Sequence, residues 1–269
     1  MFNLRLNNKF LTSFIFVSFL LIANGVQRDY CDLKCKSGNQ IFTHTVCQRT
    51  KDKCGPHQRC GSEFQVIKID DKMKHFIVNL HNDLRNKVAS GNETRGLQPS
   101  AMNMKVMTYD SELEYIAQCW ANTCNASPLK HDKCRRTRFF DHIGQNLAYV
   151  KSTALNIGLK YAIETMIMHW YDEVAIFDSE WVKSTQPRGS IKVGHYTQMV
   201  WADTNRIGCG LSFYTKTSQK TNRKWYHYFL VCNYGPGGNY IGLPVYKEGP
   251  SCKACKNGVC NKKYSSLCD

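Results

Sequence analysis

Four polar side chains in the sequence have the chemistry to bind a metal ion or to move a proton. They are two imidazoles, a carboxylate and an amide, namely His81, His195, Glu173 and Gln145. Two histidines with a carboxylate can bind a divalent metal or perform acid–base work. Their spacing alone does not bring them together, and a single polar residue at the edge of an apolar stripe is more often a hydrogen-bonded core residue. The spacing of these residues is therefore compatible with three alternatives: a metal site, an acid–base site and a structural hydrogen-bond network.

Other motifs that could carry chemistry are weaker. Cys252 and Cys255 have the spacing of a redox or zinc pair, but among so many cysteines a structural disulfide role is favoured. The chain contains no Gly-x-Ser-x-Gly elbow, no His-Glu-x-x-His motif and no phosphate-binding glycine loop. No familiar hydrolase or nucleotide-binding motif therefore supports an enzymatic reading.

Helices that would position these side chains can be predicted from apolar spacing. Apolar residues recur at helical intervals from 76 to 88, and we expect this helix to end before Gly91. Asp110 is the expected cap of a second helix. A third, longer helix is predicted from 159 to 177, and it would carry Glu173 at the edge of its apolar stripe.

Strands are predicted mainly in the second half of the chain. The segment Gly194–Trp201 alternates strictly and is interpreted as a strand. Further strands are expected at 207–213 and 225–233. The segment Gly144–Ala148 is interpreted as a glycine-led turn that carries Gln145. Helices first and strands later predict an α+β layered domain with an antiparallel sheet.

The N-terminus has the organisation of a secretory signal peptide. Two basic residues precede an uncharged apolar run at 10–22, and small residues follow at 23–25. Because the run is too short to span a bilayer comfortably, we expect cleavage after about residue 25 and no membrane anchor. No later segment is apolar enough to span. The sequence therefore predicts a secreted, extracellular protein.

Fourteen cysteines follow the signal peptide, and an even count in a secreted chain predicts disulfides. Asn92 and Asn125 begin glycosylation sequons, and Pro128 makes the second the poorer acceptor. The cysteine distribution and the periodic segments predict four parts: a signal peptide at 1–25, a cysteine-rich arm at 26–69, a core domain at 70–246 and a short cysteine-rich tail at 247–269.

The formal net charge of +15 is strongly basic. The basic residues are scattered, and no basic run with interleaved aromatic residues stands out, so we do not expect a nucleic-acid partner. The charge predicts solubility and weak attraction to anionic surfaces such as glycans or cell membranes.

Six sequence blocks carry a family resemblance when they are taken together and in order: His81–Arg85, Tyr115–Gln118, His131–Arg135, Gly144–Ala148, Gly194–Trp201 and Val231–Tyr240. They resemble the secreted CAP superfamily of cysteine-rich secretory proteins, antigen 5 and pathogenesis-related 1 proteins. Within it, the chain is similar to insect antigen 5 and venom-allergen proteins, especially the fly forms. The resemblance spans about residues 30–245 and implies a disulfide-rich α+β fold, a three-layer α-β-α sandwich with a central, mainly antiparallel sheet.

The resemblance also implies a large central cleft that holds a tetrad of two histidines and two acidic positions. Matched by motif, the tetrad is His81, Gln145, Glu173 and His195, and His81 and His195 would hold zinc or another divalent metal. Gln145 departs from the widest family pattern, which has glutamate, although antigen 5 proteins commonly share the amide. Since an amide is no base and a poor zinc ligand, weak metal binding is expected unless Glu173 completes the site.

The resemblance implies disulfide pairs as well. Cys124 would pair with Cys54 or Cys60, and the one left over would join Cys119. The four tail cysteines would pair among themselves in a short tail that lacks the channel-blocking domain of vertebrate members. The remaining implied pairs are Cys31–Cys47, Cys35–Cys134 and Cys209–Cys232.

The expected function is that of a secreted, non-enzymatic effector or allergen of saliva, venom or haemolymph. Its cargo would be a small apolar, lipid-like ligand, a divalent metal or a host extracellular protein. One alternative is a metal-dependent hydrolase that uses His81, His195 and Glu173, against which Gln145 argues. Another is a disulfide-stapled scaffold whose tetrad is a buried hydrogen-bond network.

Overall fold

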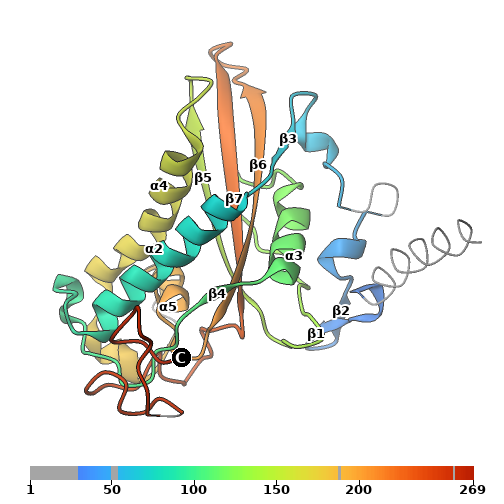
Figure 1. Ribbon diagram of the computed structural model, residues 1–269. Coiled ribbons are helices and arrows are strands. Elements are labelled where there is room, and N and C mark those ends of the chain that lie inside the picture. Colours follow the sequence, from blue (N-terminus) through green and yellow to red (C-terminus); the bar gives the residue numbers. More distant parts are fainter. Residues whose placement is uncertain (1–29, 50–53, 187–188, 257) are drawn as a thin grey trace, which may run out of the picture.

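The computed structural model describes residues 30–49, 54–186, 189–256 and 258–269. A five-stranded sheet lies at the centre of the molecule, with helices on both faces (Figure 1). The predicted disulfide-rich, three-layer α+β sandwich is confirmed. The predicted signal peptide at 1–25 lies outside the described residues.

The sheet has the order β3-β6-β7-β5, with β4 also paired to β6. Strands β6 (Arg206–Thr217) and β7 (Lys224–Gly235) form a long antiparallel hairpin, as predicted. β5 (Gly144–Ser152) pairs antiparallel with β7, and β3 (Gln65–Ile67) pairs antiparallel with β6. β4 (Thr108–Tyr109) is parallel to β6, so the sheet is mainly antiparallel.

Three longer helices cover the sheet. α2 (Asp71–Ala89) and α4 (Leu159–Tyr171) lie on one face, and α3 (Ser111–Ala121) lies on the other (Figure 1). α2 ends before Gly91, as predicted. Asp110 caps α3, because its carboxylate accepts from the backbone N–H groups of Glu112 and Leu113.

Short elements complete the chain. A two-stranded hairpin of β1 (Cys35–Ser37) and β2 (Gln40–Phe42) lies outside the main sheet. The remaining elements are one- or two-turn helices: η1 (Thr45–Cys47), η2 (Gln58–Cys60), η3 (Arg95–Leu97), η4 (Asp172–Ile176), η5 (Ser179–Lys183) and α5 (Gly194–Met199).

Apolar side chains of both helical layers pack on the sheet. On the α2–α4 side, Ile77, Ile167 and Leu230 are fully buried in one cluster. On the α3 side, Ala117 and Val231 are fully buried in a second cluster. A fully buried Leu or Ile contributes about 2–3 kcal/mol relative to exposure, so these layers dominate the stability of the fold.

Two close contacts fix the helices on the strands. A Cβ at Gly210 of β6 would lie 2.3 Å from the backbone of Gln118, so only glycine lets α3 approach this strand. On the other face, the buried Trp170 of α4 donates from Nε1 to the carbonyl of Leu147 at 3.0 Å. α4 is thereby held in register with β5, the strand that carries Gln145.

Three secondary-structure predictions are wrong. Gly194–Met199 is the helix α5 and no strand, because the Glu173 carboxylate accepts from the first backbone N–H groups of this segment. The third helix ends at Tyr171, and the chain tightens into η4 before Phe177. Gln145 lies in β5 and in no turn.

All fourteen cysteines form disulfides, as the resemblance implied. The ambiguous pairs resolve as Cys60–Cys124 and Cys54–Cys119. The tail cysteines pair among themselves, so Cys252 and Cys255 are structural and are not bonded to each other. The other five bonds are Cys31–Cys47, Cys35–Cys134, Cys209–Cys232, Cys252–Cys260 and Cys255–Cys268.

The two cysteine-rich ends attach to the core domain. β3, which falls within the predicted arm, extends the central sheet. The tail packs along α2: Lys263 and Tyr264 donate to Asn79, and Asn86 accepts from the backbone of Ser266. Within the described ranges, no helix has the length and apolar character needed to cross a bilayer.

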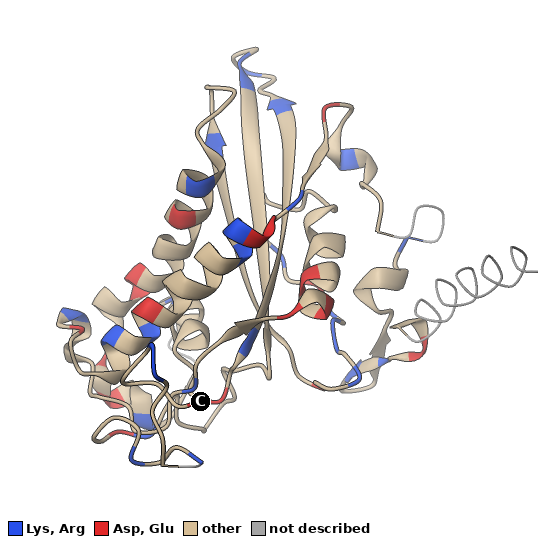
Figure 2. Ribbon diagram, viewed as in Figure 1, with Lys and Arg blue, Asp and Glu red and all other residues tan. Residues whose placement is uncertain are grey.

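Charge is unevenly distributed over the layers. Lysine and arginine are spread over the helices and loops among acidic residues. In β6 and β7, by contrast, the charged residues are all basic (Figure 2).

Candidate functional site

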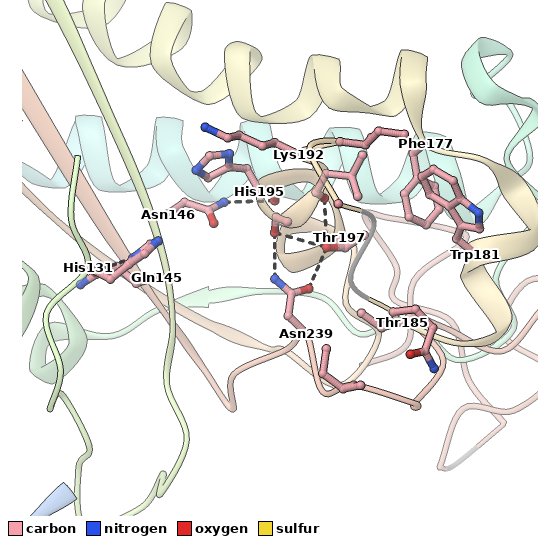
Figure 3. Close-up of a pocket in the computed structure, with 16 residues that line it drawn as sticks. His131, Gln145, Asn146, Phe177, Trp181, Thr185, Lys192, His195, Thr197 and Asn239 are labelled. Atoms are coloured by element: carbon pink, nitrogen blue, oxygen red, sulfur yellow. Dashed lines mark hydrogen bonds between the residues drawn. The ribbon is translucent and has the colours of Figure 1, made fainter. Parts of the chain in front are cut away.

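A cavity of about 470 Å³ opens beside α5, between β5 and the segment that follows η5 (Figure 3). Its two ends differ in character. One end presents the polar side chains of His131, Gln145, Asn146 and His195, and Phe177 and Trp181 lie at the other end (Figure 3). Ile191 and Ile241 also line the cavity. A volume of this size suits a small organic ligand, and the polar end offers groups that can orient it.

His195 is held by Glu173. Its Nδ1 lies 2.7 Å from Glu173 Oε1, and Glu173 Oε2 accepts from the backbone N–H groups of His195 and Tyr196 at 2.9 and 3.0 Å. An ionised carboxylate only accepts hydrogen bonds, so Nδ1 carries a proton and donates. Nε2 is the ring nitrogen left for the cavity.

Glu173 reaches α5 because α4 stops early. Asp172, the first residue of η4, accepts from Arg95 Nη1 at 2.8 Å. The next residue then points at the start of α5. The His195 ring also stacks on Trp170, with centroids 6.3 Å apart, and Asn146 donates to the His195 carbonyl at 3.1 Å.

His131 lies on the opposite wall of the polar end, beside Gln145 (Figure 3). A chain of hydrogen bonds defines its tautomer. Asn233 donates to the Leu113 carbonyl at 3.3 Å, so its Oδ1 accepts from Gln145 Nε2 at 3.0 Å. Gln145 Oε1 therefore accepts from His131 Nδ1 at 2.9 Å, which leaves an unprotonated Nε2. Burial lowers the pKa of His131 and favours this neutral form.

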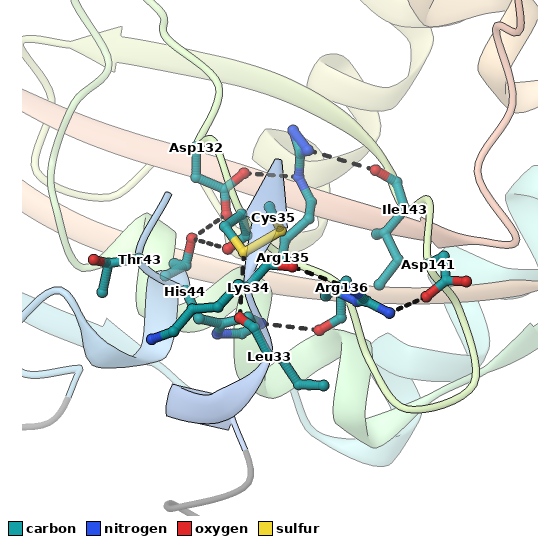
Figure 4. Close-up of a disulfide and its surroundings, with 12 residues drawn as sticks. Leu33, Lys34, Cys35, Thr43, His44, Asp132, Arg135, Arg136, Asp141 and Ile143 are labelled. Atoms are coloured by element: carbon teal, nitrogen blue, oxygen red, sulfur yellow. Dashed lines mark hydrogen bonds and ion pairs between the residues drawn. A yellow bond between two sulfur atoms is a disulfide. The ribbon is translucent and has the colours of Figure 1, made fainter. Parts of the chain in front are cut away.

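His131 has no regular secondary structure, and the residues that follow it in the chain hold it in place. Figure 4 shows the surroundings of Asp132 and of the disulfide at Cys35. The next residue, Asp132, is buried, accepts from Thr45 Oγ1 and forms an ion pair with Arg135 at 2.7 Å. The disulfide Cys35–Cys134 and a backbone hydrogen bond from Thr45 to the Cys134 carbonyl tie the same segment to the N-terminal arm.

The structure contradicts the assignment of His81 to the cleft. His81 is fully buried and does not line the cavity. Its Nδ1 donates to the Ile77 carbonyl at 2.8 Å, and its Nε2 accepts from Tyr234 Oη at 3.0 Å, which in turn accepts from Asn146. Burial lowers the pKa of His81 to about 4, so the ring is neutral and structural.

The structure therefore brings together His195, Glu173 and Gln145 and replaces His81 by His131. Sequence reasoning missed His131 as a site residue, although its block was among those that carried the family resemblance. The signal available in the sequence is the block His131–Arg135 itself, which carried part of the family resemblance.

The donor set fits a weak metal site with two protein ligands. The Nε2 atoms of His131 and His195 have no hydrogen-bond partner among the described residues, and neutral imidazole is a common zinc ligand. Glu173 is occupied by three hydrogen bonds, and Gln145 is a poor ligand. In the part of the chain that the structure describes, no group of three His, Cys, Asp or Glu side chains could hold a metal.

Comparison with known proteins gives matches over most of the chain. Residues 78–234 match the model of the Cysteine-rich secretory protein family, CAP. Venom allergen 3 of Solenopsis invicta is 44% identical over 232 residues, covering 84% of this chain and 92% of the relative. Venom allergen 5 of Rhynchium brunneum is 41% identical over 239 residues, covering 87% and 96%.

Two solved structures share the fold. BmVAL-1 superposes with a TM-score of 0.61 at 26% identity, over 75% of this chain and 95% of that one. NaASP2, crystallised with Zn²⁺, superposes with a TM-score of 0.56 at 29% identity, over 75% of this chain and 97% of that one.

Proposed function

The chain belongs to the cysteine-rich secretory protein (CAP) family, and we propose that it is a secreted, non-enzymatic, venom- or saliva-type binding protein whose cleft holds a divalent metal. The observation that carries the proposal is the pair of imidazoles in the cleft, each anchored at Nδ1 and each presenting Nε2. Such an anchor fixes the tautomer and the ring orientation that a metal ligand needs.

The metal would be held by His131 Nε2 and His195 Nε2. Zinc in this position would supply a Lewis acid with open coordination positions. With two protein ligands, we expect weak and exchangeable binding. The crystal structure of the related NaASP2 with Zn²⁺ supports the choice of zinc as the probe.

The apolar end of the cavity supports a second part of the proposal, a small organic cargo. Phe177, Trp181 and Ile241 can cover an apolar body while the polar end binds a head group. Native mass spectrometry of secreted protein should reveal such a cargo. A clean apo mass, with no uptake of added fatty acid, would remove this part and leave the metal site standing.

Two features argue against the hydrolase alternative. Gln145 cannot take a proton, and Glu173 already accepts three hydrogen bonds from α5. The scaffold alternative fits His81, whose hydrogen bonds with Ile77 and Tyr234 form a buried network. It does not account for the two Nε2 atoms in the cleft.

Calorimetric titration with zinc tests the metal site. We expect His131→Ala and His195→Ala each to weaken zinc binding at least tenfold. His75→Ala removes an exposed histidine on α2 and serves as the matched control, with unchanged affinity. Equal affinity in all four proteins would rule out the cleft as the site.

Secretion and glycosylation also belong to the proposal. We infer removal of residues 1–25 and a glycan on Asn92, whose side chain is exposed. Asn125 is half-buried, and its Oδ1 accepts from Arg59 Nη1 at 3.0 Å, which disfavours modification. N-terminal sequencing of secreted protein and a glycosidase-dependent mass shift check both statements, and Asn92→Gln should abolish the shift.

A further inference from the structure

Strands β5, β6 and β7 extend past the helices, and Lys and Arg residues lie at and near their far ends (Figures 1 and 2). We call this region the strand-end face, and all five of its basic side chains are exposed: Lys151, Lys216, Lys220, Arg223 and Lys224. No Asp or Glu occurs between Asp141 and Glu164 or between Asp203 and Glu248, the stretches that contain these strands.

One carboxylate from elsewhere reaches the strand-end face. Glu63 forms an ion pair with Lys224 at 2.6 Å. Among the ion pairs of the described residues, none neutralises Lys151, Lys216, Lys220 or Arg223. Four unpaired positive charges on a projecting end make a local positive field that attracts anions.

The sheet register holds two of these charges in fixed positions on one face. Lys216 lies opposite Trp225, and Lys151 lies opposite His227. Trp225 and His227 are two residues apart on β7, so their side chains and those of their cross-strand partners share a face. β7 lies between β5 and β6, so the two lysine positions are separated by about 10 Å across the strands.

Aromatic rings support the ammonium groups. Lys151 Nζ lies 4.9 Å from the centroid of the Trp225 ring, and Lys216 Nζ lies 5.4 Å from that of Tyr214. Tyr214 in turn stacks on His227, with centroids 5.0 Å apart. Cation–π contacts limit the freedom of the lysines, so less side-chain entropy is lost when an anion binds.

We propose that the strand-end face binds a sulfated polysaccharide. Sulfate groups repeated along a flexible chain match several fixed positive charges on an extended surface. The rings lie beneath ammonium groups, so they are not free to stack on nucleic-acid bases or to enter lipid acyl chains. A linear polyanion is therefore favoured over a nucleic acid and over a membrane.

Binding of heparin, measured by calorimetry at several salt concentrations, tests this proposal. The variant K151Q/K216Q/K220Q/R223Q should lose at least tenfold affinity at about 0.15 M salt, an ionic strength at which exposed charges are already partly screened. In nucleic acids, each neutralised charge contributes about 0.7–0.9 to the magnitude of the slope of log K against log salt. By analogy, loss of four charges should reduce the magnitude of this slope by about 3. The charge-conserving variant K151R/K216R/K220R should retain binding and shows that the face still folds.

A matched control removes the same charge elsewhere. K247Q/K253Q/K256Q/K262Q alters four exposed lysines of the cysteine-rich C-terminal tail and should leave the heparin affinity within twofold. Equal losses in both quadruple variants would overturn the proposal, since net charge alone would then explain binding. It would also be overturned if desulfated heparin bound equally well, or if phosphatidylserine vesicles bound and heparin did not.

Discussion

Replacing Glu173 by glutamine removes one proton acceptor from the centre of the site. The carboxylate accepts three hydrogen bonds, from the backbone of His195 and Tyr196 and from His195 Nδ1, at 2.9, 3.0 and 2.7 Å. The amide has one oxygen and an NH₂ group that cannot accept. At least one of the three donors, all at the start of α5, therefore loses its partner.

The magnitude follows from the kind of bond that is lost. Hydrogen bonds to a charged group contribute about 1.5–3 kcal/mol, so Glu173→Gln should lower the free energy of unfolding by about that amount at pH 7. If the NH₂ group faces Nδ1, the His195 ring moves its proton to Nε2, the nitrogen that would bind zinc. Loss of such an anchoring partner typically costs about 10–100-fold in metal affinity.

The assay is zinc calorimetry together with urea unfolding of the disulfide-intact protein. Glu180→Gln is the control, because the Glu180 side chain is 73% exposed and pairs with Lys183 on the surface. The control should change neither quantity appreciably. If Glu173→Gln keeps the zinc affinity of the wild type, whatever its stability, then the Glu173 carboxylate does not orient His195 for zinc.

Three further changes test the fold around the site. Gly144→Ala should lower the free energy of unfolding, measured in urea, by about 1–3 kcal/mol. The new Cβ would lie 1.8 Å from Gln198 Oε1, an atom that accepts a hydrogen bond from the backbone of Gly238. An unchanged free energy of unfolding would contradict this close contact. Arg85→Met should cost at least about 3 kcal/mol in the same assay, since the buried guanidinium donates to five backbone carbonyls; a loss under about 1 kcal/mol would count against it. The pKa of His81 falls from 6.5 to about 4 on folding. As the pH falls below 6.5, the imidazole is therefore protonated in the unfolded chain before it is protonated in the folded chain. The free energy of unfolding that this residue contributes above pH 6.5 is lost between pH 6.5 and pH 4. His81→Gln should therefore reduce the drop in stability between pH 7 and 4.5 by about 2–3 kcal/mol, and equal drops would show that His81 does not titrate this way.

The layered fold was predictable because its signals are local. Apolar spacing predicted α2, and the alternating runs predicted β6 and β7. The segment Gly194–Trp201 misled the prediction, because alternation is also met by chance in a short aromatic-rich run. Residues 196–199 are all buried, and the Glu173 carboxylate 22 residues away stabilises the start of the helix.

The site was half predictable, for a physical reason. His195 and Glu173 were identified because each interrupts an apolar pattern. His131 interrupts no such pattern, and its position depends on the disulfide Cys35–Cys134, which spans 99 residues. His81 interrupts an apolar stripe for a different reason, since it is a core residue whose two nitrogens are both hydrogen-bonded. Distinguishing a cleft histidine from a core histidine needs the long-range contacts.

Anomalous diffraction at the zinc edge, from crystals soaked in zinc, locates the bound metal and identifies the histidines that hold it. We expect a peak about 2.0–2.1 Å from both His131 Nε2 and His195 Nε2, with none at His81. A cleft without a peak, while surface histidines bind zinc, would show that His131 and His195 do not form a metal site.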